Sequence, residues 1–234
     1  MSNTKKIKQK TTGFDIMYRV VTALACLAIY PVFYFADLLV FAIAHTDISD
    51  ALNLFTQEQG TLHVTEDSVS LATLPEFIDL FSPFVGDGFD FKTGILQNEL
   101  YRPLVVAAVF IAIALVIGLV ILGFAIFSNK IKVIIGLSGA GFVSCLAALF
   151  SFNALANPLV SGEIALSDLL SIDGFIASLI VGLLGDVETF ALGGAFWGLM
   201  FLMLGICAWS VSVLVVNIGE EKEKAMKKAA KEHK

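Results

Sequence analysis

The sequence is poor in charged residues. Of its 234 residues, 15% are charged and 57% are hydrophobic, and the mean hydropathy is +0.86. Soluble domains carry about a quarter charged residues. The composition therefore excludes a disordered chain, argues against an ordinary soluble enzyme, and predicts a membrane protein.

Cysteine and histidine are also scarce, with three residues of each. Cys26, Cys145 and Cys207 all lie in long apolar runs, so the polar parts of the chain are not a disulfide scaffold. No Cys or His spacing is typical of a zinc site, and the phosphate-binding glycine loop, GxSxG and HExxH motifs are missing. We therefore expect no metal and no cofactor, and a membrane enzyme becomes the least favoured class of function.

Four apolar segments are long enough to cross a membrane, which takes about 20 helical residues for a core of roughly 30 Å. They run from Val20 to Ala44, Leu104 to Phe127, Val133 to Asn153 and Ala191 to Val216. Their length without polar alternation predicts helices rather than barrel strands. We expect an all-α membrane protein with a four-helix transmembrane domain over residues 20–217. The first run exceeds a signal-peptide core of about 7–15 residues, so we expect an uncleaved helix.

Basic residues are concentrated in residues 1–19, in the turn 128–132 and in the tail 218–234. These segments hold 13 of the 15 Lys and Arg residues. Basic residues beside membrane spans are retained on the cytoplasmic side. We therefore expect both ends of the chain in the cytoplasm and the loops 45–103 and 154–190 outside the cell membrane.

Acidic residues show the opposite distribution. The two outer loops hold 15 of the 21 Asp and Glu residues and have a net charge of −13, against +8 for the cytoplasmic segments. The simpler explanation is that the inner charge sets the topology and the outer charge keeps the loops soluble. The alternative is attraction of cations or of a basic partner. Asp87 and Asp90 are candidate cation ligands, although they lack the full calcium-loop pattern.

The outer loops contain signals of local structure. Alternating apolar residues around the turn-like segment 65–68 predict a β-hairpin over 60–72. A proline in the first turn predicts a short helix over 74–84. In the second loop, residues 163–166 resemble a strand, and the apolar segment 172–184 is too short to span and is typical of an interfacial or re-entrant helix.

The two loops also share a short pattern. Residues 69–74 (VSLATL) and 164–169 (IALSDL) both run apolar, small, Leu, small, polar, Leu. A duplicated two-helix unit would produce such a repeat. If the halves are duplicated, we expect the two loops to share one small sheet in an extracytoplasmic cap.

This layout of four spans, cytoplasmic ends, a long first outer loop with strands and a shorter second loop resembles the claudin-type tetraspan arrangement. Members of that family have a Trp-containing motif and a pair of cysteines in the first outer loop. Residues 45–103 contain neither Trp nor Cys. The resemblance is therefore one of architecture, and it implies no function for this chain.

Asp37 is the one charged residue inside a predicted span. An ionisable residue at membrane depth is a candidate functional site by default. Pro31 precedes it and can kink the helix. A ring of several chains could place Asp37, Ser144 and Asn153 around a pore. The alternative for Asp37 is a hydrogen-bonded carboxyl group near the membrane boundary.

Small residues cluster in the third and fourth spans. Gly136, Gly139, Ala140 and Gly141 lie in the third, and Gly194 and Gly198 form a GxxxG motif in the fourth. Small side chains let membrane helices approach closely, either within the bundle or between subunits. In the tail 218–234, Lys follows Glu at helical spacing, so we expect the fourth helix to continue past the membrane.

These features favour a non-enzymatic accessory or scaffold subunit of a membrane assembly that presents an acidic cap outside the cell. The alternative is an oligomeric ion channel or transporter that uses Asp37. We expect membrane lipids, further copies of the chain or other membrane subunits as partners, with cations or a basic partner at the outer face. We expect no nucleic-acid partner.

Overall fold

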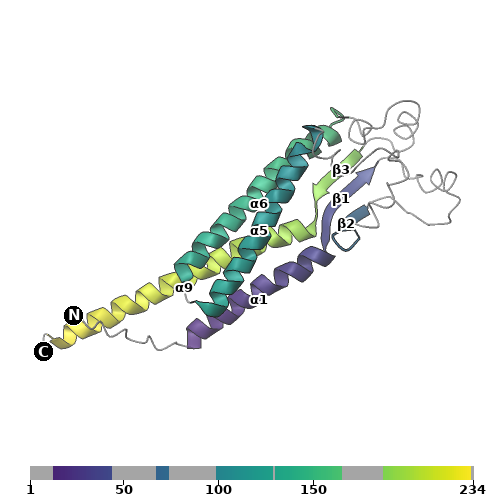
Figure 1. The fold of residues 1–234 in the computed structure, drawn as a ribbon. Coiled ribbons are helices and arrows are strands. Elements are labelled where there is room, and N and C mark those ends of the chain that lie inside the picture. The colour runs from purple at the N-terminus through teal and green to yellow at the C-terminus, as the bar shows by residue number, and fades with distance from the viewer. Residues whose placement is uncertain (1–12, 44–66, 74–98, 129, 165–186, 233–234) are drawn as a thin grey trace, which may run out of the picture.

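The computed structural model describes residues 13–43, 67–73, 99–128, 130–164 and 187–232. In this part of the chain, four long helices form an elongated bundle with a small sheet at one end (Figure 1). The helices are α1 (Gly13–Phe35), α5 (Arg102–Phe127), α6 (Ile131–Val160) and α9 (Gly194–Glu232), and a short 3-10 helix, η2 (Glu99–Tyr101), precedes α5. All four long helices are long and apolar enough to cross a membrane.

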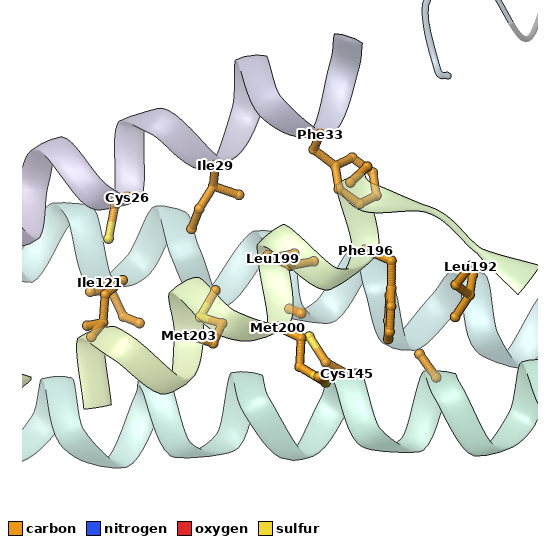
Figure 2. Packing of buried hydrophobic residues seen from close by; sticks show 14 of the residues in the cluster. Cys26, Ile29, Phe33, Ile121, Cys145, Leu192, Phe196, Leu199, Met200 and Met203 are labelled. Atoms are coloured by element: carbon orange, nitrogen blue, oxygen red, sulfur yellow. The ribbon is translucent and has the colours of Figure 1, made fainter. Parts of the chain in front are cut away.

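The four helices form a ring in which each packs mainly against two neighbours, and α5 also touches α9 across the ring. The neighbouring pairs are α1 with α5, α5 with α6, α6 with α9, and α9 with α1. Figure 2 shows the interior of this ring, where Leu199 and Met203 of α9 lie among side chains of the other three helices. Large apolar side chains also cover the outer surfaces of the helices, including Leu24, Val143 and Val215. A helix that is apolar on its outer as well as its inner face is typical of a membrane span.

The second and third spans agree with the sequence prediction. Helix α5 begins with Pro103 in its first turn, where a missing backbone N–H removes no hydrogen bond. Helix α6 extends to Val160, past the expected end at Asn153. Two residues beyond this end lies Gly162, whose φ of 75° is in the left-handed region that glycine adopts without strain.

The predicted helix over 20–44 is wrong in its last third. Helix α1 ends at Phe35, and residues Asp37–Ile43 form strand β1. A continuous apolar run does not distinguish one long helix from a helix followed by a buried strand. The fourth span is shorter at its start for the same reason, because residues 191–192 belong to strand β3 (Val187–Leu192) and α9 begins only at Gly194.

The sheet has the order β2-β1-β3 and is antiparallel throughout, where β2 is Asp67–Ser70. Strand β2 comes from the loop 45–103 and most of β3 from the loop 154–190, so both loops contribute to one sheet as expected. The two loop strands do not pair with each other, because β1 lies between them, and β1 comes from the end of the predicted first span. The predicted turn over 65–68 is wrong at its end, because Asp67 and Ser68 lie in β2 and pair with β1. Residues 60–66 lie outside the described residues.

Several other predictions also fall partly or wholly outside the described residues. These are the helix over 74–84, the helix-like segment 172–184 and the candidate cation ligands Asp87 and Asp90. In the strand-like segment 163–166, the described residues 163 and 164 form a bend rather than a strand. The duplication of the two halves stays a prediction.

The extension of the fourth helix into the tail is confirmed. Helix α9 runs without a break for 39 residues and projects past the other helices at the end away from the sheet (Figure 1). In its last part, the Lys227 ammonium group forms an ion pair with Glu223 one turn earlier. Such pairs stabilise exposed helices modestly.

Candidate functional site

The connections between the sheet and the bundle are very short. Only Ala36 separates α1 from β1, and only Gly193 separates β3 from α9. In the pairing of β1 with β3, Leu39 lies opposite Leu192 and Phe41 lies opposite Phe190. The sheet is therefore joined directly to two neighbouring helices of the ring, and we treat this junction as the candidate functional site.

Gly193 is required where the two connections meet. A β-carbon built at this position would lie 2.3 Å from the carbonyl oxygen of Asp37 and 2.7 Å from its carbonyl carbon. The Gly193 backbone N–H donates a hydrogen bond of 2.8 Å to the Leu38 carbonyl oxygen. The absence of a side chain therefore allows the backbone of the β3–α9 connection to contact the start of β1.

Trp197 closes the junction from the side of α9. Its indole Nε1 donates a hydrogen bond of 3.1 Å to the Leu192 carbonyl oxygen, and its backbone N–H donates to the Gly193 carbonyl oxygen at 3.3 Å. The indole ring also stacks on Phe201, with 6.1 Å between ring centroids. One side chain thus links the end of β3 to the first turns of α9.

Asp37 does not lie within a membrane-crossing helix, so that part of the sequence prediction is wrong. It is the first residue of β1, its side chain is exposed, and the hydroxyl of Ser68 in β2 donates a hydrogen bond of 2.6 Å to its Oδ1. Of the two alternatives for Asp37, the structure contains the hydrogen-bonded carboxyl group near the end of the bundle. A role of Asp37 in ion transport stays a prediction.

The other two polar candidates do not share a face. Ser144 is buried and Asn153 is half-buried in α6. Their separation of nine positions corresponds to about 14 Å along the helix and about two and a half turns, which places them on opposite sides of it. A single chain therefore does not line up Asp37, Ser144 and Asn153 along one surface.

The four predicted packing glycines behave differently from one another. A β-carbon at Gly198 would lie 3.4 Å from Val32 of α1, so this glycine packs inside the bundle. Apart from chain neighbours and the backbone of the same helix, no described atom lies within 4 Å of the β-carbon position of Gly136, Gly139 or Gly194. In the small-residue cluster of α6, the close helix approach is made by Gly141, whose β-carbon position lies 2.9 Å from the Met203 sulfur atom.

A second polar group of residues lies near the opposite end of the bundle. The buried hydroxyls of Tyr18 in α1 and Ser210 in α9 are 2.9 Å apart and share a hydrogen bond. The Arg19 guanidinium group donates from Nε to the Ala125 carbonyl oxygen at 2.8 Å and from Nη2 to the Ile126 carbonyl oxygen. These carbonyls belong to the last turn of α5, which carries partial negative charge.

Sequence reasoning did not predict that these residues come together at a junction. Gly193 and Trp197 lie inside a segment assigned to one apolar helix, and Ser68 lies inside a predicted turn. The adjacent pair Gly193-Gly194 was the one local signal of a break. Among the described residues, no group of three or more His, Cys, Asp or Glu side chains is arranged to hold a metal ion.

Comparisons of the chain with protein-family models, with curated proteins and with solved structures give no match.

Proposed function

We propose that this chain is an accessory or scaffold subunit of an assembly in the cell membrane, and not an enzyme. The helices associate laterally with other subunits, and the sheet end presents the acidic loops outside the cell. The observation on which this proposal depends is the outward-facing small surface of α6. Gly136 and Gly139 have open space at their β-carbon positions, and Ala140 beside them is exposed.

Small residues are valuable in membrane helices because they allow close backbone contact between helices. Within the described chain, no helix uses this contact at Gly136 or Gly139. A lipid-facing surface needs no glycine, since large apolar side chains satisfy it. The outward position of the glycines therefore supports a helix of another subunit against this part of α6.

The two ends of the bundle differ in a way that supports the proposed orientation. Tyr34 and Trp197 are partly exposed beside the sheet, and aromatic side chains of this kind are enriched at membrane boundaries. Arg19, Lys130 and Lys132 lie at the opposite end. Basic residues are retained in the cytoplasm, so we place the sheet outside.

The test of lateral assembly is the mass of the purified protein in mild detergent and in cross-linked membranes. We expect Gly136→Leu with Gly139→Leu to reduce the oligomer or to release a co-purifying subunit, with little change in thermal stability. Gly123→Leu is the matched control, because Gly123 in α5 also has open space at its β-carbon position. A monomeric wild-type protein without a co-purifying subunit would contradict the proposal.

Orientation is tested by labelling single cysteines on intact cells with a membrane-impermeant maleimide. Thr189→Cys in β3 should react, whereas Met226→Cys in the last part of α9 should react only after the membrane is permeabilised. Both positions are exposed, and Cys207→Ala in each variant removes the partly accessible native thiol. Labelling of Met226→Cys on intact cells would reverse the orientation and remove the acidic surface from the outside.

A further inference from the structure

The α5–α6 turn combines exposed apolar and basic side chains at one edge of the bundle. The Phe127 side chain, at the last position of α5, is 87% exposed, and Ile126 before it is 47% exposed. Lys130 and Lys132 follow within five residues and are both exposed. We refer to Ile126, Phe127, Lys130 and Lys132 as the turn surface.

Arg19 adds a third cation to the turn surface. Its hydrogen bonds to the Ala125 and Ile126 carbonyl oxygens hold the guanidinium group against the end of α5, directly before the turn. Asp15, in the first turn of α1, is the one acidic residue of that helix. The cations outnumber this carboxylate by three to one, so the described residues at this edge are net basic.

We propose that the turn surface and Arg19 bind the headgroup of an anionic phospholipid. This inference rests on the proposed function, because it requires the turn to lie at the cytoplasmic membrane boundary. The lysines would meet the phosphate group, and Phe127 with Ile126 would meet the upper acyl chains. Basic side chains beside a membrane attract anionic lipids strongly over about the Debye length.

The combination of groups distinguishes a lipid from a soluble anion. A free phosphate would use the lysines but would leave Phe127 in water. A phospholipid satisfies both the charge and the apolar surface, since its headgroup and acyl chains meet at the depth where a helix ends. The first turn of α6 lacks a side-chain cap, so its backbone N–H groups add to the attraction for phosphate.

The experiment is native mass spectrometry of the full chain in detergent with added phosphatidylglycerol or phosphatidylcholine. We expect the wild type to retain phosphatidylglycerol in preference to phosphatidylcholine. Lys130→Ala with Lys132→Ala should weaken phosphatidylglycerol binding roughly 10- to 30-fold. Lys222→Ala with Lys227→Ala in the α9 tail removes the same charge and should leave binding within about twofold of the wild type, because this pair lies outside the turn surface.

Equal retention of the two lipids by the wild type would overturn the proposal. An equal loss of phosphatidylglycerol binding in the two double variants would also overturn it, because it would indicate general charge attraction. Glycerol phosphate tests for a soluble anion. Binding of glycerol phosphate should be undetectable. Glycerol phosphate binding that is seen in the wild type and persists in Phe127→Ala would also overturn the lipid assignment. The same spectra report the oligomeric mass. If the wild type is an intact oligomer but shows no preference for phosphatidylglycerol, this inference is refuted and the proposed function stands.

Discussion

Gly193 and the carbonyl group of Asp37 are in such close contact that a β-carbon at position 193 would lie 2.3 Å from the carbonyl oxygen. No other described glycine has less room. The contact joins the start of β1, which follows α1, to the connection that begins α9. It is the point at which the sheet and two helices are fixed to one another.

Gly193→Ala should therefore destabilise the protein strongly. The obstructing atoms belong to the backbone of β1, which cannot move without breaking its pairing with β3. Overpacking of this kind costs about 2–3 kcal/mol, or a decrease in Tm of about 4–12 °C for a protein of this size. Gly194→Ala is the control, because its β-carbon position is open. A thermal shift assay in detergent compares them, and equal Tm values would mean that the junction is looser than described.

The Tyr18–Ser210 hydrogen bond should connect α1 to α9 measurably. Ser210→Ala leaves the Tyr18 hydroxyl buried without this partner and should cost about 1–3 kcal/mol. Tyr18→Phe should cost less, because a serine hydroxyl in a helix can turn to a carbonyl oxygen of its own helix. A double-mutant cycle should give a coupling energy of about 0.6–1.7 kcal/mol. A coupling energy of zero would show that the two hydroxyls do not interact.

Arg19 should contribute more to stability than Arg102, although both are arginines near the end of a helix. Arg19 donates to two carbonyl oxygens at the end of α5, whereas Arg102 forms an exposed ion pair with Glu99 at 3.1 Å. Hydrogen bonds from a charged group are worth about 1.5–3 kcal/mol, and exposed ion pairs about 0–1 kcal/mol. Unfolding measurements should thus show a larger loss for Arg19→Gln than for Arg102→Gln, and the reverse order would contradict the described contacts.

The pairing of β1 with β3 can be tested with a disulfide. Val40 in β1 lies directly opposite Ala191 in β3, and such Cα atoms are about 4.5–5.5 Å apart, within the range for a disulfide. We expect Val40→Cys with Ala191→Cys to cross-link on mild oxidation, detected as a linked peptide by mass spectrometry. Val40→Cys with Leu192→Cys is the control, because adjacent strand residues point to opposite faces. Equal cross-linking of both pairs would mean that the register is wrong.

The sequence was sufficient to predict the four helices because the burial of apolar surface leaves a strong signal over 20 residues. Helix α5 matches its prediction within two residues at its start and ends at Phe127 as predicted. The start of α9 was misplaced because residues 191–192 are apolar whether they lie in a strand or in a helix. Hydropathy measures the preference for an apolar environment and does not report the backbone hydrogen-bond partner.

The junction could not be predicted because it depends on contacts between distant parts of the chain. Asp37 meets Ser68 and Gly193 only after β1 has paired with both β2 and β3. The direction of the α6 glycines was equally inaccessible, because Gly136 and Gly141 differ in which side of one helix they occupy. Only the position of α9 makes Gly141 an internal contact and leaves Gly136 outside.

The unbroken length of α9 connects the sheet to the far end of the molecule. Its 39 residues correspond to about 58 Å. The helix is held by Gly193 and Trp197 at its start and, further along, by packing against α1 and α6 and by the Tyr18–Ser210 hydrogen bond. The position of the projecting tail is therefore set by the packing of the whole bundle, and a spectroscopic ruler between β3 and the tail would report any change in that packing.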